Sequence, residues 1–534
     1  MLLLLALAGC SVTEREPVTT SGAAERTVTF LSVNDIYRIE GTDNGTEGGY
    51  ARLRALRAEL EKEAPDLLML HAGDALFPSL MSRMYTGEQV IDMLNRMDGD
   101  AEAFDERLIF TPGNHEFDKD DLEDAAFLNG RINDSQFIWL DTNLTWATGD
   151  DGNPLIAAPH LMATRIVESN GVKVGFYGLI TDLAPAAYIT SFGNLEEDAR
   201  KAIRDLRKQG AELVVGVTHL TMTNDKKVLE ALGEDAPDIV FGGHEHNQIH
   251  AEVGGTKIIK ADAEARTAVV ARVTLRDGAA PEVQWEYAEL GPSAPKDDAV
   301  NKRVAYWEER LDKEYCADAG EEPGCFANVV GKTQVELVGE ELMIRLYETN
   351  FGNWIVDQAL DAAPEAHIAI GNSGSLRINQ NVPPGDVTRL HIEETFQYPS
   401  DLEVLVINGA ILQEVVNNAV TDWTGNGRWL QIAGFAFRHD PATETADQLT
   451  LLSDGEPRRI QPDDEIIAVV PSYVAGGGDG YSMLEDAKRL NIKPPTLREL
   501  VLQGLQIAGD KGISPQVEGR ICNTQEDGPC LTVQ

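Results

Sequence analysis

The stretch that most limits how this chain can fold is Thr111–Asp118, which reads TPGNHEFD. It directly follows the short apolar run 107–110, so a β-strand is expected to end where Gly113, Asn114 and His115 begin. Open α/β sheets keep their ligand sites at the carboxyl ends of strands. An amide oxygen beside an imidazole at such an end is typical of a metal site.

Four other polar stretches also close hydrophobic runs. They are Asn34-Asp35, Gly73-Asp74, Thr218-His219 and Gly243-His244-Glu245-His246. Segments with helical spacing lie between these runs, and strands that alternate with helices predict a layered α/β fold. We therefore expect all five motifs at the ends of successive strands of one sheet.

The same patterns predict the remaining elements and the domain limits. Strands are expected at 27–33, 66–71, 107–110, 137–140, 172–180, 213–217, 239–241, 269–275, 283–290, 367–370, 403–407 and 465–470. Helices are expected at 50–64, 86–97, 196–209, 301–314, 341–360, 411–420 and 497–507. The Pro-rich segment 291–298 marks a boundary, which gives a first domain at 27–293, a connector at 294–329 and a second domain at 330–534.

The composition describes an acidic globular protein. Against 45 Lys and Arg stand 88 Asp and Glu, so the formal net charge is −43. Such a surface repels DNA and RNA, which excludes a nucleic-acid polymer as partner, and it also occurs in proteins that work in salty media. If the substrate is anionic, bound cations must offset this field locally.

The first residues, MLLLLALAGC, are too short an apolar run to span a bilayer. They resemble the lipobox of bacterial lipoproteins, which implies a lipid on Cys10, a tether at 11–26 and a place in the bacterial envelope, in the periplasm or at the outer membrane. The alternative is a leucine-rich start on a soluble chain. The close pairs Cys316/Cys325 and Cys522/Cys530 predict local disulfides in an exported chain and leave Cys10 unpaired.

The polar motifs provide ligands for two metal ions. A two-metal hydrolase needs one carboxylate that bridges both ions, with oxygen and imidazole ligands around it. Asp74 is the expected bridge, since it follows a buried strand at a tight turn. The other expected ligands are Asn114, His219 and His244 for one ion, and Asp35 and His246 for the other. A single histidine at a strand end is more often structural, so the hypothesis depends on the five motifs together.

The motif order ND, GD, GNHEFD, TH and GGHEH resembles the calcineurin-like metallophosphoesterases. With its second half, the chain resembles the bacterial periplasmic and animal ecto 5′-nucleotidase family from Thr27 onward. The resemblance implies a four-layer α/β sandwich, then a smaller α/β nucleotide-binding domain. It also implies two divalent ions, such as Zn or Mn, and attack of water on phosphorus. His115 would stabilise the phosphoryl charge or assist the leaving group, and Asp118 would orient its ring.

The resemblance also assigns residues to a nucleotide substrate. Those expected near phosphate or sugar are Asn143, Arg345, Asn372, Arg377 and Asp479. Tyr398 and Tyr473 occupy the positions of two aromatics that sandwich the purine, and base stacking of this kind contributes about 1–3 kcal/mol and tolerates different bases. The site would then lie between the two domains.

One position departs from the family pattern, which is Asp-x-His where this chain has Asp35-Ile36-Tyr37. Three alternatives are open. Tyr37 could bind as a phenolate, which favours iron; it could lie outside the ligand shell; or the first ion could be absent and the protein inactive.

The predicted function is therefore release of phosphate from nucleoside 5′-monophosphates outside the cytoplasm. Alternatives within the same chemistry are a 2′,3′-cyclic nucleotide phosphodiesterase, a nucleotide-sugar hydrolase and a sulfur-ester hydrolase. The alternative from another class is a surface lipoprotein that binds nucleotides without turning them over. The sequence predicts no oligomeric state.

Overall fold

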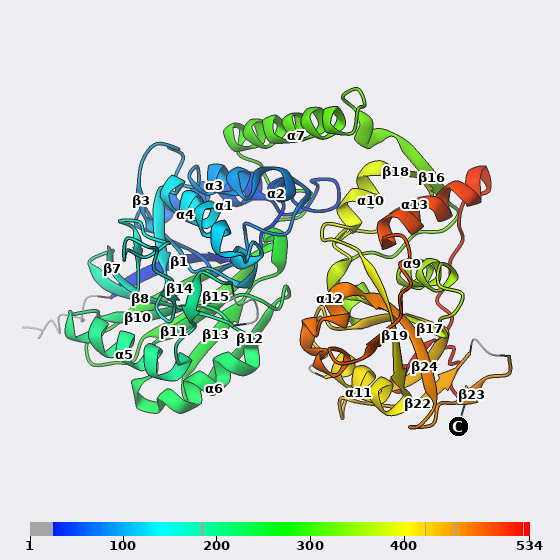
Figure 1. The fold of residues 1–534 in the computed structure, drawn as a ribbon. Coiled ribbons are helices and arrows are strands. Elements are labelled where there is room, and N and C mark those ends of the chain that lie inside the picture. Colours follow the sequence, from blue (N-terminus) through cyan, green and yellow to red (C-terminus); the bar gives the residue numbers. More distant parts are fainter. Residues whose placement is uncertain (1–24, 183–185, 422, 453–454, 527, 534) are drawn as a thin grey trace, which may run out of the picture.

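The computed structural model describes residues 25–182, 186–421, 423–452, 455–526 and 528–533. Two bodies are joined by the long helix α7 (Asp298–Asp318), which lies across the top of Figure 1. Cys10 and most of the expected tether lie outside the described residues. Within those residues, no helix is both long enough and apolar enough to cross a membrane.

The first domain contains two sheets. A seven-stranded sheet has the order β15 (Glu282–Glu289), β14 (Thr267–Leu275), β1 (Arg26–Val33), β2 (Leu68–His71), β3 (Asp105–Phe110), β4 (Phe137–Leu140) and β6 (Leu161–Met162). A six-stranded sheet has the order β12 (Ile249–Val253), β13 (Thr256–Lys260), β11 (Ile239–Gly242), β10 (Leu213–His219), β8 (Val172–Ile180) and β7 (Thr164–Ser169). Strands β1, β2, β3 and β4 are parallel, as are β8, β10, β11 and β13.

The two sheets pack face to face over a shared apolar core. Phe30 of β1 lies in this core against Phe176 of β8 and Phe241 of β11. The outer face of the first sheet packs on α1 (Tyr50–Glu63), α2 (Leu80–Tyr85), α3 (Glu88–Leu94), α4 (Ala125–Asp134) and α7. The outer face of the second sheet packs on α5 (Leu195–Lys208) and α6 (Met222–Leu232). This confirms the layered α/β fold that the alternating pattern predicts and the four-layer sandwich that the family resemblance implies.

The second domain is a smaller α/β unit. Its five-stranded sheet has the order β20 (Leu430–Ala433), β17 (Ile368–Asn372), β24 (Glu465–Pro471), β19 (Leu402–Asn408) and β25 (Lys488–Arg489). One face packs on α9 (Asn350–Asp361) and α13 (Leu497–Ala508), and the other on α11 (Gly409–Val420) and α12 (Ser472–Ala475). A four-stranded sheet adjoins it, with the order β23 (Arg458–Arg459), β22 (Thr445–Leu451), β21 (Phe435–Asp440) and β26 (Ile521–Asn523).

The prediction of a single helix over 341–360 is wrong. The structure divides it into α8 (Glu341–Leu346) and α9, because Thr349 has extended backbone angles and its side chain accepts a hydrogen bond from the Gly352 N–H. A threonine in this role begins a new helix. The first residue of α8, Glu341, contacts His246 of the first domain.

Both predicted disulfides are present in the described residues. Cys316 at the end of α7 pairs with Cys325, and Cys522 of β26 pairs with Cys530. Each closes a short loop, so each fixes local chain geometry in the connector or at the C-terminus. Disulfides persist in oxidising compartments, which agrees with an exported chain.

Candidate metal centre and catalytic site

The predicted ligands converge at one edge of the sandwich, but they come from two sheets. Asp35, Asp74 and Asn114 follow β1, β2 and β3 of the seven-stranded sheet. His219 ends β10, and the GHEH loop follows β11, in the six-stranded sheet. The expectation of a single sheet is therefore wrong. Because the parallel strands of both sheets end at the same edge of the sandwich, the ligands still meet.

The backbone that carries these ligands turns sharply. Asp35, Asp74, His244 and His246 all have positive φ, between 55° and 89°. Such strain in non-glycine residues clusters at functional sites, where surrounding structure enforces it. At Gly113 a Cβ would lie 2.1 Å from Asp74 Oδ1, so only glycine allows this loop to approach the carboxylate.

One group of ligand atoms surrounds the Tyr37 hydroxyl. That oxygen lies 3.3 Å from Asp35 Oδ1, 3.2 Å from Asp74 Oδ2 and 3.0 Å from His246 Nε2. His246 Nε2 lies 3.0 Å from Asp35 Oδ1. Ligands bound to one ion at roughly 2.1 Å lie about 3 Å apart, so these four side chains have the spacing of a ligand set.

A second group lies on the other side of Asp74. His219 Nε2 is 3.1 Å from Asp74 Oδ2, while its Nδ1 is 2.7 Å from the Ala72 carbonyl. Donation by Nδ1 leaves Nε2 as a bare acceptor facing a carboxylate, and a cation between them would satisfy both. Asn114 Oδ1 is also buried without a hydrogen-bond partner in the described part of the chain. The His244 ring lies 5.3 Å from that of His219. The residues fit a second ion.

The electrostatics of the cluster favour positive charge. Burial lowers the pKa of His219, but Asp74 and Asp35 outweigh burial and raise it to about 10. Burial likewise lowers the pKa of His246, but Glu341 and Asp35 raise it to about 9. His244 behaves differently, because burial and the nearby His219 lower its pKa to about 3. Carboxylates that hold protons on two histidines would hold metal cations in their place.

The predicted catalytic pair lies beside this cluster. The ring atom His115 Nδ1 is 2.9 Å from Asp118 Oδ1. The backbone N–H of His115 donates to Asp74 Oδ1 at 2.8 Å. His115 Nε2 lies 4.0 Å from Asp74 Oδ2. The second domain reaches the same pair, since the Tyr398 hydroxyl donates to Asp118 Oδ2 at 2.9 Å and Arg377 Nη2 lies 3.3 Å from His115 Nε2.

The other predicted substrate residues occupy three environments. Asn372 Nδ2 donates to Asp479 Oδ2 at 2.8 Å, and the Tyr473 hydroxyl donates to Asp479 Oδ1 at 3.0 Å. Tyr473 as a residue is 59% exposed. Arg345 is buried and pairs with Glu341 at 2.9 Å. Asn143 donates both amide hydrogens to backbone carbonyls, those of Ile180 and Phe192, so its amide holds the loop after β8. Sequence reasoning did not predict that structural role.

Glu116, within the GNHEFD motif, has a role that the sequence did not predict. Its buried carboxylate accepts the backbone N–H groups of Gly113, Asp74, Ala75 and Leu76, at 2.5 to 2.9 Å. It thereby locks the loops after β2 and β3 together. Its position within the GNHEFD motif was the only feature of the sequence that could have indicated this role.

Lys260 is a second missed residue, and it supports the GHEH loop. Its buried ammonium lies 2.8 Å from Asp225 Oδ2 and 2.7 Å from Glu245 Oε2, and it donates to the Leu220 carbonyl at 2.7 Å. Glu245 stands between the two predicted histidine ligands of that loop. The ion pairs therefore fix where both imidazoles lie.

Replacing Lys260 with Met is expected to lower the free energy of unfolding by about 3–5 kcal/mol, because two buried carboxylates lose their counter-charge. Urea unfolding measures the change. The matched control is Lys257→Met on the same strand, whose partner Glu252 is 56% exposed and whose loss should cost about 0–1 kcal/mol. Equal effects of the two substitutions would contradict this account.

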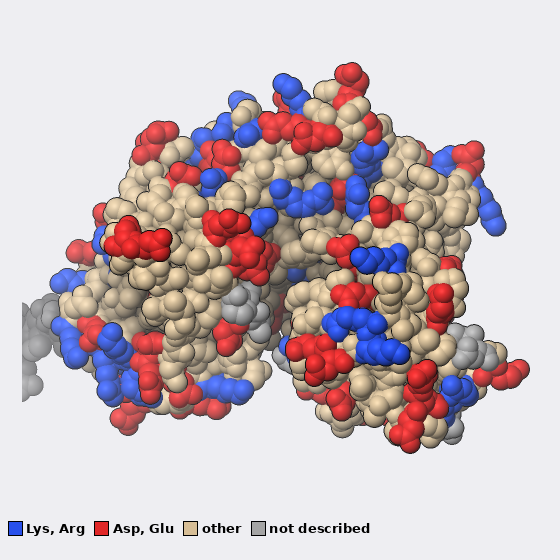
Figure 2. Space-filling view, in the orientation of Figure 1, with Lys and Arg blue, Asp and Glu red and all other residues tan. Residues whose placement is uncertain are grey.

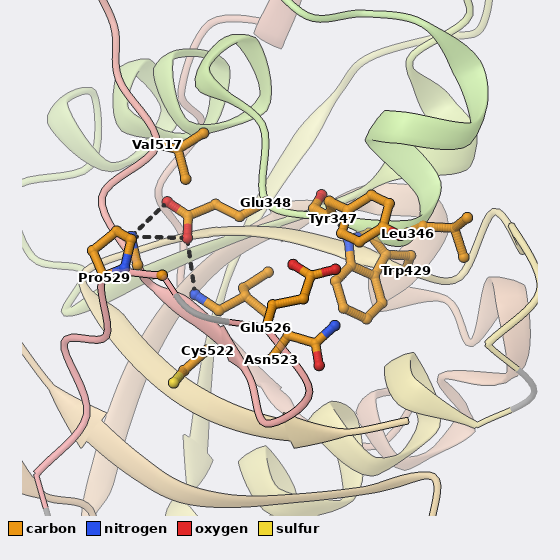
Figure 3. A pocket seen from close by; sticks show the side chains of 12 residues that line it. Leu346, Tyr347, Glu348, Trp429, Val517, Cys522, Asn523, Glu526 and Pro529 are labelled. Carbon is orange, nitrogen blue, oxygen red and sulfur yellow. Dashed lines mark hydrogen bonds between the residues drawn. The ribbon is translucent and has the colours of Figure 1, made fainter. Parts of the chain in front are cut away.

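Two cavities differ in their relation to the cluster. The molecule is hollowed between its two domains (Figure 2), and a cavity of about 220 Å³ there is lined by Tyr37 and Arg38 of the first domain and Gln380 and Glu394 of the second. A pocket of about 110 Å³ lies within the second domain beside Trp429 (Figure 3). Its Glu348 carboxylate accepts the backbone N–H groups of Gly519 and Ile521, so this side chain holds the C-terminal segment in place.

Comparison with known proteins agrees with this geometry. Residues 28–248 match the calcineurin-like phosphoesterase family, and residues 329–486 match the family of the 5′-nucleotidase C-terminal domain. Protein 5NUC of Lutzomyia longipalpis is 24% identical, and the match covers 94% of each chain. A 5′-nucleotidase of Diplobatis ommata is 25% identical, and the match covers 93% of this chain and 90% of its own.

The solved 5′-nucleotidase precursor of Thermus thermophilus shares the fold, with a TM-score of 0.77, 21% identity and coverage of 94% of this chain and 100% of its own. The sandwich and its strand-end ligands thus define a calcineurin-like phosphoesterase, a class that binds divalent metals. With its C-terminal domain, the chain belongs to the 5′-nucleotidase family of phosphoric monoester hydrolases.

Proposed function

We propose that this chain releases phosphate from nucleoside 5′-monophosphates with the help of two divalent metal ions. The observation that carries the proposal is the position of Asp74. Its Oδ2 atom lies 3.2 Å from the Tyr37 hydroxyl in one ligand group and 3.1 Å from His219 Nε2 in the other. A carboxylate shared by two ligand groups is what a two-metal hydrolase requires.

Residues of the chain would bind and orient the phosphate beside this centre. When bound, the ions supply positive charge that polarises the phosphoryl group and activates water. Arg377 is buried, and its Nη1 has no hydrogen-bond partner among the described residues, so it can donate to a phosphate oxygen. Asp118 and Tyr398 hold the Nδ1 side of His115, which directs Nε2 toward the centre, where it can give a proton to the leaving oxygen.

The second domain would bind the nucleoside. Asp479 and Asn372 carry hydrogen-bonding groups for ribose or base, and the exposed Tyr473 ring offers a stacking face. The ring of Tyr473 packs over Gly478, where a Cβ would lie 2.4 Å from it. We propose 27–293 and 330–534 as the domain limits, with the connector between them. The nucleotide would lie between the two domains.

The two disulfides support a site of action outside the cytoplasm. We propose that a lipid on Cys10 anchors the chain to the bacterial envelope. Labelling the protein in its host with a radioactive fatty acid tests this, with Cys10→Ser as control. A wild-type chain that takes up no label would contradict the anchor.

A phosphate-release assay tests the proposed reaction. With AMP and added Mn, Zn or Fe, we expect release that stops on chelation by EDTA and returns when metal is restored. Release from 2′,3′-cyclic AMP or a nucleotide sugar at a higher kcat/KM would favour those alternative substrates. Binding of AMP without release, across all three metals, would contradict the proposal and favour a binding lipoprotein.

Tyr37→Phe is expected to lower the affinity for one ion by at least about tenfold, a typical cost of losing a group around a metal site. The hydroxyl lies within 3.3 Å of three predicted ligand atoms, so we propose that it binds that ion. Titration calorimetry with Mn measures the affinity. If iron is the native metal, the wild type should also show a phenolate charge-transfer band that the variant lacks. Unchanged affinity would place Tyr37 outside the ligand shell.

A further inference from the structure

The imidazole of His246 is held from both sides by carboxylates of different domains. Its Nε2 lies 3.0 Å from Asp35 Oδ1 of the first domain. Its Nδ1 lies 2.6 Å from Glu341 Oε1, which belongs to the second domain. Both carboxylates and the imidazole are buried. Glu341 is 95 residues distant in the chain and carries no motif that connects it with a metal site.

Glu341 is itself fixed in place. It is the first residue of α8, and Arg345 one turn later lies 2.9 Å from the same Oε1 atom. The contacts with Arg345 and His246 therefore hold this carboxylate in a single geometry.

A neighbouring contact ties the start of α8 to the same loop. Arg266 of the first domain lies 3.2 Å from Glu340 Oε1 and donates to the His246 carbonyl at 3.3 Å. Glu340 in turn accepts the Met343 N–H at the beginning of the helix. The His246 side chain and its backbone are thus both held where α8 docks.

A carboxylate on one ring nitrogen decides what the other can do. A histidine that donates from Nδ1 keeps Nε2 free as a metal ligand, with the ring fixed in orientation and made more basic. Nε2 is the atom that lies with Asp35, Tyr37 and Asp74. Glu341 contacts the opposite side of the ring, so it acts through His246 and is not itself a ligand.

We propose that Glu341 is a positioning residue of the metal centre, so that the second domain sets the affinity for the ion beside Asp35 and His246. The inference rests on the proposed two-metal function. It has a consequence for turnover, because any movement that lifts α8 from the first domain withdraws the carboxylate from His246. That ion is then held less tightly, while the ion beside His219 and Asn114 keeps all its contacts.

Manganese titration of the full chain without substrate tests this. For Glu341→Gln, which keeps the size of the side chain and removes its charge, we expect one of two ions to bind about 10–100-fold more weakly and the other unchanged. Glu341→Ala should weaken the binding of that same ion by at least as much. The matched control is Glu365→Gln, an exposed carboxylate of the second domain, for which both affinities should equal those of the wild type.

A second measurement distinguishes positioning from general loss of structure. The rise in the midpoint of thermal unfolding on adding manganese should shrink in Glu341→Gln. The rise is measured from each variant's own metal-free midpoint, because loss of the buried ion pair with Arg345 lowers that midpoint by itself. Wild-type affinity for both ions in both Glu341 variants would overturn the inference. An equal loss of affinity for both ions would also overturn it. A wild type that binds no ion would instead refute the proposed function, so the two failures are distinguishable.

Discussion

Asp74→Asn is expected to lower kcat/KM for AMP by about 10³-fold or more, the equivalent of roughly 4 kcal/mol of transition-state stabilisation. Asp74 Oδ1 accepts a hydrogen bond from the backbone N–H of His115, and Asp74 Oδ2 faces both ligand groups. An amide oxygen carries no negative charge, so it is a poor bridge between two cations. Phosphate release and metal content per chain measure the effect together, and both should fall.

The control for this experiment lies at the opposite end of the same strand, β2. Asp66 precedes β2 at its other end, is half exposed and pairs with Arg107 at the surface. Asp66→Asn changes the same chemical group far from the cluster, so activity and metal content should remain at the wild-type level. If Asp74→Asn retained two ions and full turnover, the bridging role and the proposed function would both be wrong.

The strand-end ligands were predictable because they depend on local patterns. An apolar run that stops at Gly-Asp or Gly-Asn-His fixes a side chain at the carboxyl end of a strand, whatever the rest of the fold does. The sequence did not indicate that β10 and β11 form a sheet of their own. Both sheets have buried parallel strands with the same continuous apolar pattern, so periodicity cannot assign a strand to one of them.

Contacts between the domains were not predictable from local patterns. The Tyr398 hydroxyl donates to Asp118, 280 residues earlier in the chain, a contact that the expected stacking of its ring on a base did not indicate. Glu341 was expected only as the first residue of a long helix. The break at Thr349 and the docking of α8 bring it to His246. Such contacts depend on how the two domains pack against each other. The periodicity of apolar residues within one segment does not indicate which residues of the other domain it will contact.

His115→Gln is expected to lower kcat for AMP by about 10²–10⁴-fold, the usual contribution of a positioned acid or base, with both ions still bound. His115 contacts Asp118, Tyr398 and Arg377 through its ring, and only its backbone N–H reaches Asp74 at hydrogen-bond distance. Loss of the ring therefore leaves the ligand groups complete. Metal analysis and steady-state kinetics measure the two quantities, with the exposed His250→Gln as control.

The choice of leaving group separates the two roles that His115 can have. An alkoxide such as the nucleoside 5′-oxygen needs a proton as it departs, whereas p-nitrophenolate is a stable anion that leaves without one. If His115 Nε2 supplies the proton, His115→Gln should lose far less activity with p-nitrophenyl phosphate than with AMP. Equal losses on both substrates would assign the imidazole to stabilising phosphoryl charge instead. Loss of an ion from the variant would contradict both roles and make His115 a ligand.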